Sequence, residues 1–267
     1  MSNQYNKKPR IILMADYLGG YEIAKYLYNS EENIVGLVVR SDNQSNYLNN
    51  KYKKKILKLV KINKKNIFDW ETFKKTKNLS KIIKLKPDYI LTMMCCGILN
   101  PKIINTAKIG CINLHLSYLP HCRGKNPNVW AIINKKPAGV TIHWIDKKID
   151  TGAIIAQKKI KINSIDTGKS VYKKCEKNAS KLFVKVWPKI KQNKISAIKQ
   201  NNKIASLNYS KDFNKLSKIN LKKKYKAEDL INLIRAKTFR PFTGLIFEDS
   251  LGREIQARIH LSYLKKK

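Results

Sequence analysis

The chain has 267 residues and 43% of them are apolar, so a sizeable core can form and wholesale disorder is excluded. Lysine and arginine number 56 against 18 aspartates and glutamates, and this net charge of +38 attracts anionic molecules. The longest uncharged apolar run, residues 89–99, is too short to span a bilayer, and the N-terminus predicts no signal peptide.

The first third of the chain predicts alternating strands and helices. An apolar strand at 10–15 is followed by a helix at 18–29 and by a second apolar strand at 34–39. Strand, helix and strand within thirty residues form a βαβ unit, which implies a parallel sheet. The lysine- and asparagine-rich segment 42–78 predicts only a short strand near 59–62.

The same alternation continues to about residue 190. In chain order it predicts a helix at 79–85, a strand at 88–94, a short helix at 101–106, strands at 111–116 and 139–144, and an amphipathic helix at 168–190. The strand at 88–94 is apolar on both faces, as expected inside a parallel sheet that is covered on both sides. We therefore predict an α/β fold with a doubly wound, mostly parallel, Rossmann-like sheet.

A polar stretch at 191–202 predicts a linker to a smaller C-terminal unit. That unit contains an amphipathic helix at 227–236 and a hairpin with strands at 244–247 and 254–260. We predict a catalytic domain over residues 1–195 and a small α+β unit over 196–267, which contributes to substrate binding or dimerisation.

Asn113 and His115 are the first candidates for chemistry. They lie two apart in a predicted strand and so share a face, close to its carboxyl end, where open α/β sheets bind ligands. An amide donor beside an imidazole base can polarise a carbonyl and accept a proton, which suits acyl transfer. Asp150 is the candidate carboxylate that orients the imidazole. The alternative, two satisfied polar groups at a strand end, is equally compatible with the spacing alone.

A longer stretch, from Asp88 to Gln157, resembles the formyltransferases that use 10-formyltetrahydrofolate. The matching pieces are the N-x-H strand, a Ser-x-Leu-Pro turn, Arg-Gly, G-V-T-I-H, and a D-x-G-x-I-x-x-Q tail that begins at Asp150. This family contains glycinamide ribonucleotide formyltransferase, methionyl-tRNA formyltransferase and the sugar N-formyltransferases. The resemblance implies that Asn113, His115 and Asp150 are catalytic, that 10-formyltetrahydrofolate is the cosubstrate, and that no metal is needed.

The resemblance also implies where the folate binds, largely through backbone groups of two loops. One follows the strand at 88–94 and the other follows the strand at 139–144; the candidate residues are Cys95, Cys96, Gly97, Ile98, Leu99, His143 and Asp146. For the side chains of Cys95 and Cys96, a role as small buried apolar groups is the favoured interpretation. Five cysteines, two of them adjacent, form no disulfide framework and favour the cytoplasm.

Two segments resemble the sugar N-formyltransferases in particular: RGKNPNVW from Arg123, and IRAKTFRPFTG from Ile234, in which Arg240 stands where those enzymes have proline. With the turn after the first strand, they supply the substrate candidates Asp16, Tyr17, Gly19, Gly20, Ser117, Arg123, Gly124, Asn126, Phe239 and Phe242. Simpler roles remain open: a tight strand–helix turn at 16–20, an ion pair at Arg123, and core packing for the two phenylalanines.

We therefore predict a dimeric N-formyltransferase that acts on a nucleotide-linked amino sugar, with dTDP as the expected nucleotide, in the synthesis of lipopolysaccharide O-antigen. The alternatives are methionyl-tRNA formyltransferase and a basic RNA- or DNA-binding protein without catalysis. Only seven of the 56 basic residues are arginine, and the lysines are spread along the chain, which favours a compositional bias over a nucleic-acid site. The segment after residue 191 is also short for the extra domain of the tRNA enzyme.

Overall fold

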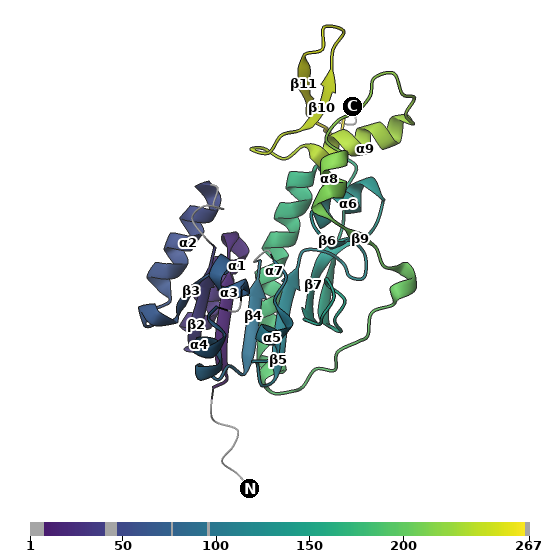
Figure 1. Cartoon of the computed structure of the whole chain (residues 1–267). Helices are drawn as coiled ribbons and strands as arrows, with labels where there is room; N and C mark the ends of the chain where they lie inside the picture. Colours follow the sequence, from purple (N-terminus) through teal and green to yellow (C-terminus); the bar gives the residue numbers. More distant parts are fainter. Residues whose placement is uncertain (1–7, 41–46, 76, 95–96, 265–267) are drawn as a thin grey trace. The chain divides into compact units, whose positions relative to one another are not determined.

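The computed structural model describes residues 8–40, 47–75, 77–94 and 97–264 (Figure 1). The chain forms two compact units, each assembled from three separate stretches. The first unit comprises Met1–His115, Ile142–Ala156 and Ala179–Lys199, and the second comprises Leu116–Thr141, Gln157–Asn178 and Gln200–Lys267. The predicted domain boundary after residue 195 stays a prediction.

A seven-stranded sheet runs in the order β3, β2, β1, β4, β5, β7, β8. Its strands are β1 (Arg10–Ala15), β2 (Asn33–Val39), β3 (Ile67–Asp69), β4 (Tyr89–Met93), β5 (Gly110–His115), β7 (Ala138–Trp144) and β8 (Ile154–Ile160). β1 pairs in parallel with β2 and with β4, and the pairs β2–β3 and β4–β5 are also parallel. The predicted α/β fold with a mostly parallel sheet is confirmed.

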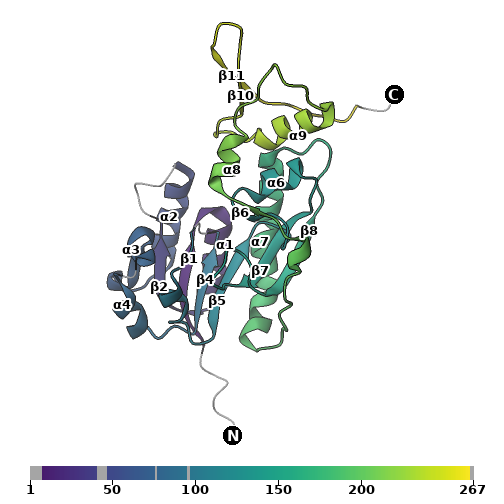
Figure 2. The ribbon, with the colours of Figure 1, turned by 45° about the vertical axis from the view of Figure 1, so that its right-hand side comes forward.

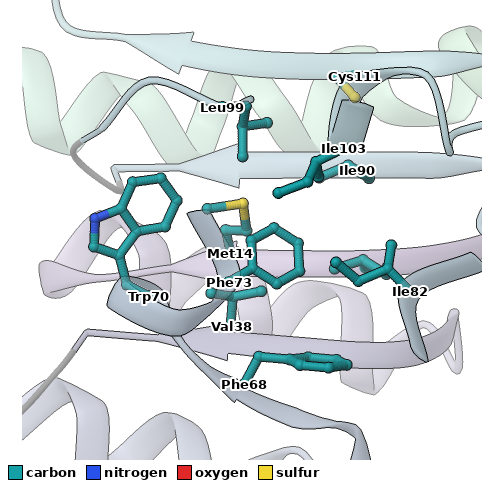
Figure 3. Packing of buried hydrophobic residues seen from close by; sticks show 11 residues of the cluster. Met14, Val38, Phe68, Trp70, Phe73, Ile82, Ile90, Leu99, Ile103 and Cys111 are labelled. Atoms are coloured by element: carbon teal, nitrogen blue, oxygen red, sulfur yellow. The ribbon is translucent and has the colours of Figure 1, made fainter. Parts of the chain in front are cut away.

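One face of the sheet in the first unit is covered by three short helices, α3 (Trp70–Lys74), α4 (Leu79–Lys84) and α5 (Pro101–Ile104). A cluster of buried side chains from these helices and from the strands fills this layer (Figure 3); it includes Ile12, Met14, Val38, Phe73, Ile82, Ile90 and Ile103. Gly97 lies against this layer with φ of +148°, and a Cβ there would lie 1.8 Å from the Trp70 ring. Only glycine fits at that position.

The opposite face is covered by α1 (Tyr17–Asn29) and by the part of α7 (Gly168–Lys191) that belongs to the first unit. Tyr89 precedes Ile90 in β4 and so points to this other face, where its ring lies 5.3 Å from that of Trp187. Tyr26 of α1 meets Phe183 of α7 edge-on at 6.3 Å. The predicted helices at 18–29 and 168–190 are confirmed.

The predicted strand near 59–62 is wrong, because a helix, α2 (Tyr47–Leu59), ends there. Tyr52 and Ile56 are four residues apart and so lie on one face of that helix. Ile56 is fully buried, and the Tyr52 ring lies 6.1 Å from that of Tyr21 in α1. A short 3-10 turn, Lys64–Asn66, then leads into β3, the actual edge strand.

The second unit contains helices and two small sheets. Its further elements are β6 (Arg123–Gly124), α6 (Pro127–Ile133), a 3-10 turn (Asn202–Ile204), β9 (Leu207–Asn208), α8 (Ser210–Lys215), α9 (Ala227–Lys237), β10 (Leu245–Glu248) and β11 (Glu254–Ala257). β6 pairs in parallel with β9, and β10 pairs with β11 as the predicted antiparallel hairpin (Figure 2). α9 packs against α6, and the Nη1 atom of Arg235 donates to the carbonyl oxygens of Asn163, Ser164 and Asp166.

Among the residues that the structure describes, every helix is too short or too polar to cross a membrane.

Candidate active site

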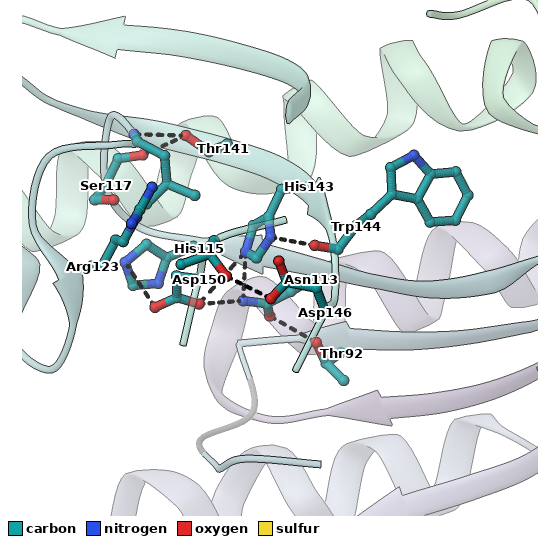
Figure 4. A network of polar contacts seen from close by, with 12 residues as sticks. Thr92, Asn113, His115, Ser117, Arg123, Thr141, His143, Trp144, Asp146 and Asp150 are labelled. Atoms are coloured by element: carbon teal, nitrogen blue, oxygen red, sulfur yellow. Dashed lines mark hydrogen bonds and ion pairs between the residues drawn. The ribbon is translucent and has the colours of Figure 1, made fainter. Parts of the chain in front are cut away.

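Three polar side chains converge at the carboxyl end of β5 (Figure 4). Asn113 and His115 lie two apart on this strand, and Asp150 follows β7 with a φ of +51°. Asn113 Nδ2 donates to Asp150 Oδ1 over 3.3 Å, and Nε2 of His115 lies 3.7 Å from Asp150 Oδ2. The structure thus brings together, within the first unit, the three residues that the sequence nominates for catalysis.

His115 and Asp150 are both mostly shielded from water, with side chains 11% and 13% exposed. Charges interact more strongly where water is largely excluded, so the carboxylate stabilises a positive charge on the imidazole. The remaining exposure leaves room for a reacting group to approach. His115 is therefore placed to accept a proton from a nucleophile and to hold it beside Asp150.

A second imidazole, His143 at the end of β7, reaches the same carboxylate from a buried position. Its Nε2 lies 3.5 Å from Asp150 Oδ1 and 3.1 Å from Asn113 Nδ2, and its Nδ1 lies 2.7 Å from the carbonyl oxygen of Trp144. A carbonyl oxygen only accepts, so Nδ1 carries a hydrogen. Nε2 faces an amide donor, so it accepts. Both ring nitrogens of His143 are therefore engaged by protein groups, which leaves His115 as the candidate base beside Asp150.

Thr92 of β4 joins this group from the neighbouring strand. The parallel register pairs Thr92 with Asn113, and Thr92 Oγ1 lies 2.7 Å from Asn113 Oδ1. Thr92 is not among the site residues predicted from the sequence. Its signal was a lone polar residue inside an otherwise apolar strand, because such a residue needs a hydrogen-bond partner nearby.

The loop between His143 and Asp150 is shaped by Asp146. The Asp146 carboxylate accepts a hydrogen bond of 2.6 Å from Thr151 Oγ1 and one of 3.0 Å from the backbone N–H of Lys148. These bonds close the loop on itself and aim Asp150 toward β5. Asp146 itself is exposed at the rim of the site.

The predicted folate loop after β4 is described only in part, because Cys95 and Cys96 lie outside the described residues. Gly97 packs on Trp70, and the Leu99 side chain belongs to the core cluster. Ile98, in contrast, is 67% exposed and presents an apolar surface. Of the described residues in this loop, Ile98 presents its side chain to a ligand, whereas Gly97 and Leu99 have only backbone groups to offer.

The turn 16–20 forms the start of α1. Asp16 caps that helix by accepting from the backbone N–H of Tyr17, and it also pairs with Arg40, whose guanidinium lies 5.6 Å from the centre of the Tyr17 ring. Burial raises the pKa of Asp16, although Arg40 opposes the shift. Gly19 and Gly20 are buried, and a Cβ on Gly20 would lie 2.8 Å from the carbonyl oxygen of Met93. Gly20 therefore serves close packing of α1 against β4.

Four substrate candidates lie in the second unit around β6. Arg123 is 7% exposed and donates to Gln200 Oε1 over 2.7 Å and to Asn202 Oδ1 over 2.9 Å. Gly124 and Asn126 adopt positive φ angles of 86° and 53° on the way into α6, and Ser117 is buried. Arg123 thus has a defined structural role, tying this turn to the segment before β9.

The two phenylalanine candidates differ in exposure. The Phe239 ring lies 5.4 Å from that of Tyr172 and 5.2 Å from that of Phe242. Phe242 is 50% exposed. Phe242 is therefore the ring with a surface available for stacking, whereas Phe239 supports it.

Gln157, the last residue of the D-x-G-x-I-x-x-Q tail, has a role that sequence reasoning missed. Its Nε2 donates to the carbonyl oxygen of Leu119 over 2.7 Å and to Thr141 Oγ1 over 2.9 Å. Thr141 Oγ1 in turn donates to the carbonyl oxygen of Ser117. Gln157 therefore holds the Ser-x-Leu-Pro turn, whose Leu119–Pro120 peptide bond is cis.

Across the described residues, no cluster of His, Cys, Asp and Glu could hold a metal ion.

Comparison with known protein families gives two matches. Residues 20–187 match the model described as formyl transferase, and residues 212–263 match the N-formyltransferase dimerization C-terminal domain. Among curated proteins, the chain is 39% identical over 165 residues to the bifunctional polymyxin resistance protein ArnA of Wigglesworthia glossinidia brevipalpis. It is 33% identical over 141 residues to a methionyl-tRNA formyltransferase of Methylacidiphilum infernorum.

These curated alignments cover 60% and 52% of this chain, but the chain spans only 24% and 44% of the two relatives' lengths. Solved structures match more fully. A 4-N formyltransferase from Francisella tularensis has a TM-score of 0.80 and 27% identity, with 96% of this chain and 99% of that chain covered. The formyltransferase PseJ from Anoxybacillus kamchatkensis has a TM-score of 0.53 and 28% identity, with coverage of 77% and 88%. The chain belongs to the formyl transferase family.

Proposed function

We propose that this protein transfers a formyl group from 10-formyltetrahydrofolate to the amino group of a nucleotide-linked amino sugar. The observation that carries the proposal is the arrangement of Asn113, His115 and Asp150 at the carboxyl end of β5. An imidazole paired with a carboxylate, next to an amide donor, suits attack of an amine on a formyl carbon. The family membership supports this reaction class.

Each of the three side chains has a defined task in that reaction. His115 accepts the proton that the sugar amine loses when its nitrogen bonds to the formyl carbon, and Asp150 stabilises the resulting imidazolium. Asn113 donates to the formyl oxygen as negative charge develops there. His115 then returns the proton to the folate nitrogen as the bond between that nitrogen and the formyl carbon breaks.

The folate would lie between the two loops at this edge of the sheet. The exposed Ile98 offers an apolar surface for a flat aromatic ring, which fits a pterin. His143 and Asp146 are already hydrogen-bonded within the second loop and its strand, so they shape the loop. The PseJ structure was obtained with tetrahydrofolate and a UDP-linked 4-formamido sugar, which supports a folate and a nucleotide sugar as the reactants here.

The nucleotide and the position of the amine are finer parts of the proposal. The Francisella protein is a 4-N formyltransferase, which makes a 4-amino sugar the first substrate to try. The expected nucleotide is dTDP, with UDP as the alternative that PseJ suggests. We also propose a role in the synthesis of lipopolysaccharide O-antigen.

The proposal includes a homodimer in the cytoplasm. The match of residues 212–263 to a dimerization domain supports the dimer. Among the described residues, Cys111, Cys122 and Cys175 form no disulfide, which favours a reducing compartment.

Methionyl-tRNA formyltransferase is the rival enzyme, and residues outside the catalytic core disfavour it. Its alignment covers only about half of this chain, whereas residues 212–263 match a domain of N-formyltransferases. A basic protein that only binds RNA or DNA would need neither the His115–Asp150 pair nor Asn113.

The deciding experiment is a formylation assay with 10-formyltetrahydrofolate. The acceptors are dTDP-, UDP- and GDP-linked 4-amino and 3-amino sugars, with charged initiator tRNA alongside. We expect product with one nucleotide sugar and little with tRNA. Comparable turnover of the tRNA would instead establish the rival enzyme, and no turnover of any acceptor, together with salt-sensitive RNA binding, would favour the binding protein.

A further inference from the structure

We propose that Thr92 and His143 are positioning residues that clamp the carboxamide of Asn113, and that the hydrogen which Asn113 gives to Asp150 is the one later offered to the formyl oxygen. This inference rests on the proposed function. It assigns a role to Thr92, and it changes the role of His143 from a folate contact to a support for Asn113.

The first half of the clamp is the hydroxyl of Thr92. Thr92 is 5% exposed, and its Oγ1 lies 2.7 Å from Asn113 Oδ1 and 3.3 Å from the carbonyl oxygen of Ile112. Because an amide oxygen only accepts, the Thr92 hydroxyl donates its hydrogen to Asn113 Oδ1 across the shorter of these two contacts. The parallel pairing of Thr92 with Asn113 makes the two side chains neighbours on one face of the sheet.

The second half of the clamp fixes which way round the carboxamide lies. Asn113 Nδ2 has two acceptors, Nε2 of His143 at 3.1 Å and Oδ1 of Asp150 at 3.3 Å. If the amide were reversed, its oxygen would face an ionised carboxylate, which accepts but cannot donate. Asp150 thus excludes the reversed amide. His143 and Thr92 stabilise the other orientation, in which Nδ2 faces His143 and Asp150 and Oδ1 faces Thr92.

This arrangement engages every hydrogen-bonding hydrogen of Asn113. The amide has two hydrogens, one given to His143 and one to Asp150, so neither is spare for a formyl oxygen. One of the two bonds must be exchanged when the reaction begins. The bond to Asp150 is the longer one, and Asp150 is 13% exposed whereas the His143 side chain is 2% exposed. The exchange therefore takes place on the Asp150 side.

The exchange also suits the movement of charge. When Asn113 turns this hydrogen bond toward the formyl oxygen, Asp150 loses one neutral donor just as His115 becomes positively charged. The carboxylate then stabilises the imidazolium with one hydrogen bond fewer to its Oδ1 atom. No covalent bond changes in this step; only the acceptor of one hydrogen bond changes.

Two matched pairs of variants test the clamp. Thr92→Val keeps the shape and removes the hydroxyl, and Thr92→Ser restores it; His143→Phe removes the acceptor, and His143→Gln restores one. We expect Thr92→Val and His143→Phe to lower kcat about ten-fold or more, with KM for both substrates within about two-fold, since the loss of one positioned hydrogen bond is of this size. Ser and Gln should recover most of the loss. The pH dependence of kcat/KM should keep its wild-type midpoint in the Thr92 pair, because His115 and Asp150 are untouched.

A second readout needs no activity. In a ¹⁵N-labelled protein, the side-chain NH₂ signals of Asn113 can be assigned by their loss in Asn113→Ala. We expect these signals to exchange slowly with solvent in the wild type and Thr92→Ser, and to shift and exchange faster in Thr92→Val and His143→Phe.

The outcomes separate this inference from the proposed function. Wild-type kcat in both Thr92→Val and His143→Phe would overturn the clamp while leaving the formyl transfer intact. A wild-type protein that formylates no amino sugar would overturn the function, and the NMR measurement would still decide whether the clamp exists. Unchanged Asn113 signals in all four variants would overturn the clamp in either case.

Discussion

Oδ2 of Asp150 lies 3.7 Å from Nε2 of His115, and this pair accounts for the proton transfer in the proposed reaction. We expect His115→Ala and Asp150→Ala each to lower kcat by about 10²–10⁴, the range for loss of a general base. Affinity for the nucleotide sugar should stay nearly unchanged, because the pair acts on a proton and not on the nucleotide. Steady-state kinetics with calorimetry of nucleotide binding checks both. His260→Ala, at an exposed histidine of the second unit, is the matched control; wild-type turnover in His115→Ala would remove His115 from the mechanism.

Asn113→Ala tests the amide donor separately from the base. We expect kcat to fall by about 10²–10³, as for the loss of one donor to a developing oxyanion. The pH at which the rate rises should stay that of the wild type, because His115 and Asp150 remain. Rate–pH profiles of both proteins provide the measurement, and an Asn113→Ala enzyme of undiminished kcat would contradict the assignment.

Phe242 and Phe239 should respond differently to removal of their rings. Phe242 is half exposed, so we expect Phe242→Ala to weaken nucleotide binding about five-fold with little change in thermal stability. Phe239 contacts Tyr172 and Phe242, so Phe239→Ala should mainly lower the melting temperature. Calorimetry with the nucleotide and thermal unfolding of both variants separate the effects. Equal nucleotide affinity in Phe242→Ala and the wild type would show that its ring does not stack on the base.

Three buried thiols should be inert in the folded protein. Burial raises the pKa of Cys111 and of Cys175 to about 12, and that of Cys122 to about 11. At pH 8 almost none of their thiolate, the reactive form, is present. We expect iodoacetamide to modify these three residues only after denaturation, as read by peptide mass mapping. Rapid labelling of Cys122 in the native protein would mean that the turn around it opens.

Acid should destabilise the second unit through Asp166. Burial works to raise the pKa of Asp166, but hydrogen bonds from Lys174, the Asn163 backbone and Ser170 outweigh it and lower the pKa. A carboxyl whose pKa is depressed on folding stabilises the fold above its unfolded-state pKa, about 3.9, and loses that contribution as pH falls through its folded-state pKa. Asp166→Asn should therefore unfold more easily at pH 7, by about 1–3 kcal/mol, and should lose part of the wild-type acid dependence. Urea unfolding between pH 3 and 7 measures this, with the exposed Asp229→Asn as control. Parallel pH curves for Asp166→Asn and the wild type would contradict it.

The sequence predicted the central strands because they are short runs of mostly apolar residues, as in β1, β4 and β5. It missed α2, whose apolar residues are separated by lysines, and β8, in which polar residues interrupt the run. β6 and β9 have two residues each. They form by pairing Arg123 with Leu207, which lies 84 residues further along the chain, so no local sequence pattern predicts them. In the site, spacing alone placed Asn113 and His115 on one face. The role of Thr92 depends on the register between β4 and β5 and so could not be read from either strand by itself.

The interleaving of the two units determines when the chain can fold during its synthesis. The first unit lacks its last stretch until residue 199 has left the ribosome, and the second lacks its last stretch until residues 200–267 have been made. β6 is made 84 residues before the strand that pairs with it, and Arg123 is made 77 residues before its partner Gln200. A nascent chain stopped between residues 142 and 199 therefore exposes apolar residues of the segment Leu116–Thr141 that are buried in the folded protein, such as Leu119 and Val129. We expect such stalled chains to be bound by chaperones and cut by proteases, so that a late nonsense mutation removes the enzyme from the cell rather than shortening it.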